Sequence, residues 1–224
     1  MKQVERFIQE SDRMLRIDVD GGVWLKPGAA VAYRGNIGFD RRPTLGAASL
    51  IDAAFRELTP IVRATGSGRM YCGHHGAHVR ILHLQSETIF VVWDELLAFD
   101  ESLRFEPGVV DHGIGIASGG LVRIKLSGTG SVAIITHGDP LRLEVTPGDP
   151  LSTDPHATIA WSEGLTPVLK TDLSWRSIFA HGGHEPIQML FNGTGYVIVQ
   201  PYEEPRRFTL EAKSLQKLAA LLAG

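Results

Sequence analysis

The sequence predicts a mainly β protein with a β-sandwich or jelly-roll-like body, and three observations indicate this fold class. The 224 residues include 25 glycines and 12 prolines, which disfavour helix interiors and divide the chain into short elements. Between these breaks, apolar and polar residues alternate with a period of two. The alternating segments are separated by turn residues, as in a sandwich or barrel. We therefore expect one β domain over residues 1–224.

Eight segments carry the alternating pattern of β-strands: residues 15–19, 79–84, 88–93, 121–126, 131–135, 141–145, 188–191 and 196–200. Two other segments have their apolar residues at helical spacing. Residues 46–58 form the first and end before Pro60, while residues 208–222 form the second and contain no proline or glycine. The sequence therefore predicts two helices beside the sheets.

An internal repeat organises the strands. Three segments, residues 27–39, 93–105 and 147–159, align without gaps and begin 66 and 54 residues apart. The alignment superposes Val31, Leu97 and Leu151, then Asn36, Ser102 and His156, and finally Phe39, Phe105 and Ile159. Gly-Thr-Gly also recurs at residues 128–130 and 193–195, with residues 74–79 as a degraded counterpart. Three copies of one β unit would pack into a pseudo-threefold body, since none could close a core alone.

The composition argues against several classes of protein. Hydrophobic residues make up 43% of the chain and charged residues 21%, which is typical of a folded globular protein. The net charge of −3 offers no overall attraction to a phosphate backbone, so we expect no nucleic-acid binding. No segment approaches the roughly 20 apolar residues of a membrane span. One cysteine, Cys72, cannot form an internal disulfide, which favours a cytoplasmic location.

A cluster of possible metal ligands lies at residues 71–78, where Cys72, His74 and His78 would share one face of an extended strand. Thiolate and imidazole ligands suit zinc or another transition metal, and His112 or His137 could complete the site. The alternative is a turn that happens to carry histidines, because the stretch also contains two glycines.

Catalytic motifs are missing from the sequence. The two Gly-Thr-Gly segments open no helix and lack the lysine of a phosphate loop, so we interpret them as bulges or hairpin entries with positive φ. Acidic residues recur in the turns of the repeat, where we expect them to face solvent: Asp94, Glu95, Asp100, Glu101, Asp149 and Asp154. We therefore predict no catalytic residues and no cofactor.

Three phrases of the sequence resemble a known family. They are residues 145–155 (VTPGDPLSTDP), 126–132 (LSGTGSV) and 191–201 (FNGTGYVIVQP). They are similar to the bacterial relatives of altered inheritance of mitochondria protein 24, over residues 15–200. The resemblance implies a fold like that of the tryptophan RNA-binding attenuation protein and association as trimers. It implies no catalytic residues.

These observations together predict a non-enzymatic binding or scaffold protein that acts as a homotrimer, with a protein partner that the sequence does not identify. The alternative is a metal-binding β domain or metal-dependent enzyme that uses Cys72, His74 and His78.

Overall fold

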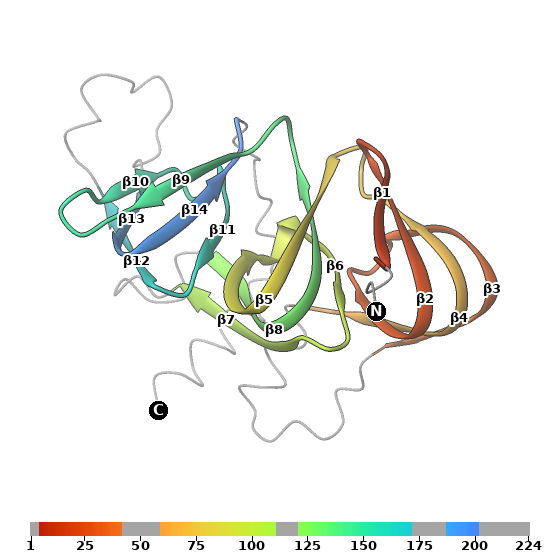
Figure 1. Ribbon diagram of the computed structural model, residues 1–224. Helices are drawn as coiled ribbons and strands as arrows, with labels where there is room; N and C mark the ends of the chain where they lie inside the picture. The colour runs from red at the N-terminus through yellow and green to blue at the C-terminus, as the bar shows by residue number, and fades with distance from the viewer. Residues whose placement is uncertain (1–4, 42–58, 111–120, 172–186, 202–224) are drawn as a thin grey trace, which may run out of the picture.

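The computed structural model describes residues 5–41, 59–110, 121–171 and 187–201 (Figure 1). Within these ranges the chain forms fourteen β-strands and one 3-10 helix, η1 (Trp93–Glu95). The prediction of a mainly β protein is confirmed. Both predicted helices, at residues 46–58 and 208–222, lie outside the described residues.

The strands in chain order are β1 (Phe7–Ser11), β2 (Met14–Leu25), β3 (Ala30–Arg41), β4 (Val62–Cys72), β5 (His78–Val92), β6 (Leu96–Asp100), β7 (Arg104–Val110), β8 (Leu121–Thr136), β9 (Leu141–Val145), β10 (Leu151–Thr153), β11 (Thr158–Ser162), β12 (Leu165–Thr171), β13 (Ile187–Gly193) and β14 (Gly195–Val199). Eleven of them form one sheet in the order β3-β4-β2-β6-β8-β5-β11-β14-β9, with β1 beside β2 and β7 beside β8. The other three form a sheet in the order β10-β13-β12. All of the pairings are antiparallel.

The strands fall into three groups with the same pairing pattern. In group 1, β4 pairs with both β2 and β3. In group 2, β8 takes the place of β4 and pairs with β5 on one side and with β6 and β7 on the other. In group 3, β13 and β14 together take that place, between β9 and β10 on one side and β11 and β12 on the other.

A glycine with positive φ lies at the same point of each group. Gly66 in β4, Gly128 in β8 and Gly193 at the end of β13 have φ of 125°, 123° and 122°. A side chain at Gly66 would meet the carbonyl of Asn36, and one at Gly193 would meet the carbonyl of Gly164. Gly66 and Gly193 therefore need to be glycine, because a side chain would lack space and because their φ is positive. The interpretation of the Gly-Thr-Gly segments as backbone irregularities with positive φ is confirmed.

The strand pairing corrects the register predicted for the third repeat segment. The ladders β3–β4, β6–β8 and β11–β14 each have a register shift after their first residue pair. The residue that the pairing skips is the bulged one, and it is Val31 in β3, Leu97 in β6 and Ile159 in β11. Ile159, rather than Leu151, therefore shares the bulged position of Val31 and Leu97. The predicted alignment matched turn residues, which recur in unrelated turns, whereas hydrogen bonding along the ladder sets the register. Gly66-Ser67-Gly68, rather than residues 74–79, is the counterpart of Gly-Thr-Gly.

Several strands are longer than the alternation predicts. The predicted strands at residues 79–84 and 88–93 join in β5, except that Trp93 belongs to η1, and those at residues 121–126 and 131–135 join in β8. Strands β5 and β8 pair with each other, and their ladder continues past one bulged residue, Ser86, which lies beside Gly128. Strands β3 and β4 were not predicted, because Gly35, Gly38, Gly66 and Gly68 interrupt their alternation.

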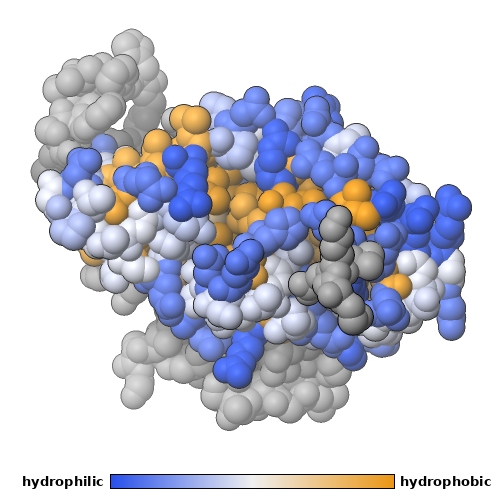
Figure 2. Space-filling view, in the orientation of Figure 1, coloured by the Kyte–Doolittle hydropathy of each residue, from blue (hydrophilic) through white to orange (hydrophobic). Residues whose placement is uncertain are grey.

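Three hydrophobic clusters fill the interior, one near each group. Their largest fully buried side chains include Phe7, Phe99, Trp161 and Phe191. Trp161 lies between two other rings, with ring centroids 5.6 Å from Phe90 and 5.7 Å from Phe191. Figure 2 shows hydrophobic residues in a band across the middle of the molecule, with hydrophilic residues on either side.

Candidate functional site

The structure separates the predicted metal ligands. Strand β4 ends at Cys72, and a turn follows in which His75 and Gly76 have positive φ (45° and 71°). The prediction that Cys72, His74 and His78 share one face is therefore wrong, because the chain is not extended between them. Among the described residues, no three His, Cys, Asp or Glu side chains are placed to hold a metal ion. His112 lies outside the described residues.

The Cys72 thiol belongs to the hydrophobic interior. It is fully buried in the hydrophobic cluster nearest group 1, which also includes side chains from group 2, and its cross-strand neighbours are Leu15 and Ala30. Burial raises the pKa of Cys72 to about 12. The side chain is therefore a protonated thiol at neutral pH, which is neither a nucleophile nor a ready metal ligand.

His74 is partly buried beside a second imidazole. Its ring centroid lies 4.2 Å from that of His75, in an edge-to-face arrangement. Burial lowers the pKa of His74 to about 4, with smaller contributions from the charges of Lys26, His75 and His137. His74 is therefore neutral at physiological pH.

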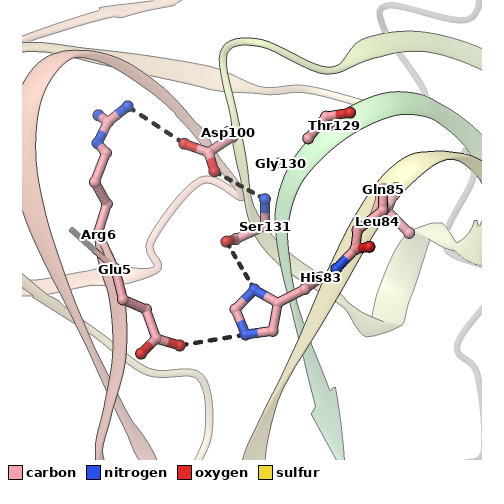
Figure 3. Close-up of a pocket in the computed structure, with 9 residues that line it drawn as sticks. All are labelled: Glu5, Arg6, His83, Leu84, Gln85, Asp100, Thr129, Gly130 and Ser131. Atoms are coloured by element: carbon pink, nitrogen blue, oxygen red, sulfur yellow. Dashed lines mark hydrogen bonds and ion pairs between the residues drawn. The ribbon is translucent and has the colours of Figure 1, made fainter. Parts of the chain in front are cut away.

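A pocket of about 410 Å³ lies where group 1 meets group 2 (Figure 3). It is lined by Glu5, Arg6, His83, Leu84, Gln85, Asp100, Thr129, Gly130 and Ser131. These residues come from the segment before β1 and from β5, β6 and β8. The alternation of β5 turns His83 outward and Leu84 into the core, which places the imidazole at the pocket wall.

A chain of polar contacts crosses the pocket (Figure 3). Arg6 Nη1 lies 3.3 Å from Asp100 Oδ1, and the Ser131 amide donates a hydrogen bond of 2.8 Å to Asp100 Oδ2. Ser131 Oγ then contacts His83 Nδ1 at 3.2 Å. His83 Nε2 lies 3.3 Å from Glu5 Oε1. Arg6 also donates to the backbone carbonyl of Gly22 at 3.1 Å, which fixes its orientation.

The order Ser131, His83, Glu5 resembles that of a catalytic triad, but its surroundings do not suit acyl transfer. An oxyanion hole needs free amide donors near the nucleophile, and the Ser131 amide is bonded to Asp100. The Asp100 carboxylate would also repel a developing oxyanion. His83 and Glu5 are both at least half exposed, so no dry environment strengthens their contact. These surroundings do not favour activation of Ser131 as a nucleophile.

Sequence reasoning missed most of this pocket. Its residues lie far apart in the chain, and only the folding of β5, β6 and β8 brings them together. The expectation that the turn acids face solvent is also wrong for Asp100 and Glu95, which are both buried. Asp100 is balanced by Arg6, and Glu95 accepts a contact of 3.5 Å from Gln200 Nε2. Exposed serines and histidines at strand faces give no signal of their own.

No helix among the described residues has the length and apolar character needed to cross a membrane.

Comparison with known proteins places the chain in a family. The model of the family described as mitochondrial biogenesis AIM24 matches residues 6–202. The crystal structure of a protein from Streptococcus pyogenes has a similar fold, with a TM-score of 0.67 and 21% sequence identity over 97% of this chain and 96% of that one. No curated protein matches the chain. Because the family model covers most of the sequence, the protein belongs to the AIM24 family, as the resemblance of its sequence phrases indicates.

Proposed function

We propose that this chain is a non-enzymatic binding or scaffold protein that works as a homo-oligomer, with a trimer as the expected state. The observation that carries the proposal is the apolar surface of the edge strand β3. Val31 is 61% exposed, Tyr33 54% and Phe39 39%, and the rings of Tyr33 and Phe39 pack against each other at 5.2 Å. Edge strands that remain free in solution usually carry charges or proline instead. Apolar side chains along an edge are typical of a surface that another chain covers.

The strand groups support a pseudo-threefold body as part of this proposal. All three groups have the same pairing order, a bulge at the equivalent residue and a glycine of positive φ at the equivalent point. A jelly-roll-like arrangement of three copies of one unit accounts for these shared features. Repeated units stack through similar interfaces, so the terminal units of the chain are suited to contact further units.

The pocket between Glu5 and Ser131 supports the binding role. Its wall offers a guanidinium, two carboxylates, an imidazole, a carboxamide and two hydroxyls, so it suits a small polar ligand with both donors and acceptors. The balanced charge of the chain favours a ligand or protein partner over nucleic acid. The single buried thiol is consistent with the proposed cytoplasmic location.

Three measurements test the proposal. Light scattering of the purified chain gives the oligomeric state, and a defined multiple of the 24.4 kDa chain mass is expected. A broad screen of ester, amide and phosphate substrates tests the absence of catalysis. We expect no turnover above that of a Ser131→Ala, His83→Ala variant. Turnover that disappears in this variant would contradict the non-enzymatic role. Fluorescence anisotropy with mixed-sequence oligonucleotides at moderate salt should show no binding. Micromolar affinity would contradict the expectation that the chain does not bind nucleic acid.

A further inference from the structure

Two equivalent junctions join the three strand groups. At the first, β2 of group 1 pairs with β6 of group 2, with the partners Val23↔Asp100, Trp24↔Phe99 and Leu25↔Ala98. At the second, β5 of group 2 pairs with β11 of group 3, with the partners Ile89↔Ser162, Phe90↔Trp161 and Val91↔Ala160. Both junctions therefore join β2 or β5, which lies on one side of its group, to β6 or β11, which lies on the other side of the next group.

The two junctions have the same register. Val23, Ile89 and Leu151 lie opposite Ala64, Leu126 and Phe191, which are each two residues before the glycine of positive φ. Tyr33, Phe99 and Trp161 lie opposite Met70, Val132 and Val197, which are each four residues after that glycine. Residues 23–25, 89–91 and 151–153 are thus equivalent, and so are residues 32–34, 98–100 and 160–162.

A third junction of this kind is not formed within the described part of the chain. It would join residues 151–153 of β10 to residues 32–34 of β3. Strand β3 is at one end of the large sheet, and β10 is at an edge of the small one, so each has one unpaired side among the described strands. The two strands lie at opposite ends of the molecule (Figure 1), so they cannot pair with each other within one copy.

Burial shows what the missing junction leaves uncovered. Leu97 and Ile159 are completely buried, whereas the equivalent Val31 is exposed. Phe99 and Trp161 are 1% exposed, whereas the equivalent Tyr33 is more than half exposed. The side chains at these positions of β3 are therefore apolar, as in the other groups, but lack the neighbouring group that covers their equivalents.

We propose that a second copy of this chain covers β3 by forming the third junction, with β10 of one copy antiparallel to β3 of the next. The expected partners are Leu151↔Arg34, Ser152↔Tyr33 and Thr153↔Ala32. This interface rests on the proposed function, since it specifies how the homo-oligomer is built. The contact is heterologous, because the two copies use different edges. It extends the large sheet from one chain to the next by the same strand addition that joins the groups within a chain.

Disulfide trapping tests the register. Tyr33→Cys and Ser152→Cys place one new thiol on each side of the interface, at exposed positions where a fold defect is not expected. Directly opposed residues on antiparallel strands have Cα atoms about 4.5 to 5.5 Å apart, within the range of a disulfide. The native Cys72 is buried and does not compete.

The two variants, carrying different tags, are co-expressed and oxidised. We expect a disulfide-linked dimer that contains both tags, and little linked product from either variant alone. Tyr33→Cys with Val168→Cys is the matched control, because Val168 is exposed on β12, outside the proposed junction. Efficient linkage of Tyr33→Cys to itself would overturn the proposal in favour of a β3–β3 dimer. An oligomer without mixed linkage would overturn the interface alone, whereas a monomeric wild type would overturn the proposed function as well.

Discussion

Val31 and Leu97 occupy the same bulged position in their strands, yet Leu97 is completely buried and Val31 is 61% exposed. The difference follows from position in the sheet. Leu97 lies where β6 is flanked by β2 and β8, while β3 has β4 on one side and no described strand on the other. The exposure of Val31, at a position where Leu97 is buried, is the main structural reason for proposing that the chain assembles with copies of itself.

Gly66 should be among the positions most sensitive to substitution. In Gly66→Ala the new methyl group would meet the carbonyl of Asn36, and φ of 125° is strained for any residue with a Cβ. We expect the free energy of unfolding to fall by about 1 to 3 kcal/mol, measured by guanidinium titration. Gly38→Ala is the matched control, because a Cβ there would meet only Thr65 Oγ1 at 4.0 Å. Equal losses in the two variants would contradict the backbone argument.

Asp100 should stabilise the fold through the groups that it satisfies. Asp100→Ala would leave the Ser131 amide without its acceptor and Arg6 without its carboxylate. Loss of a buried partner of this kind costs about 1 to 3 kcal/mol, which thermal or chemical unfolding can measure. Glu101→Gln removes a neighbouring but more exposed ion pair, with Arg63, and should change stability by less than about 1 kcal/mol. A larger loss of stability in Glu101→Gln than in Asp100→Ala would contradict this role of Asp100.

Cys72 should be unreactive in the folded protein. Its pKa of about 12 and its burial leave almost no accessible thiolate at pH 8. We expect a thiol reagent such as Ellman's reagent to react slowly with the native chain and to label one thiol rapidly in guanidinium. Rapid labelling of one thiol per native chain would show that the β4 end is open, contrary to the structure.

Stability should decline as the pH falls from about 6.5 toward 4, in part because of His74. Its pKa is about 4 in the folded chain, against an ordinary value of 6.5, so the unfolded chain binds a proton in this interval that the folded chain does not. Binding of protons by the unfolded state favours unfolding. The denaturation midpoint of His74→Gln should therefore vary less with pH than that of the wild type over this interval. An unchanged pH dependence in His74→Gln would remove His74 from the explanation.

Alternation predicted the strands whose two faces differ in burial, such as residues 15–19, because the period of two is visible wherever one face is apolar. It failed for β3 and β4, where glycines at residues 35, 38, 66 and 68 replace the side chains that would show the pattern. The repeat register of groups 1 and 2 agrees with the strand pairing, since both place Val31 with Leu97. The third segment was misplaced because its proline, glycine and aspartate residues suit many turns.

The pocket could not be predicted in the same way. Arg6 and Asp100 are 94 residues apart, and the pairing of β2 with β6 brings them together. The cluster at residues 72–78 had the opposite problem, because residues close in sequence were separated by a turn and by burial of Cys72. Contacts between distant strands depend on the order of the sheet, which local patterns do not encode.

The mass of the chain in solution tests the central claim most directly. Light scattering of the wild type and of Tyr33→Lys, at about 10 μM or higher, should give a defined oligomer for the wild type and a mass near 24.4 kDa for the variant. A lysine at this position would place a charge in the proposed junction, whereas Val168→Lys changes an exposed valine elsewhere and should leave the oligomer intact. A wild type with a mass of 24.4 kDa, or an oligomer that Tyr33→Lys and Val168→Lys affect equally, would contradict the account.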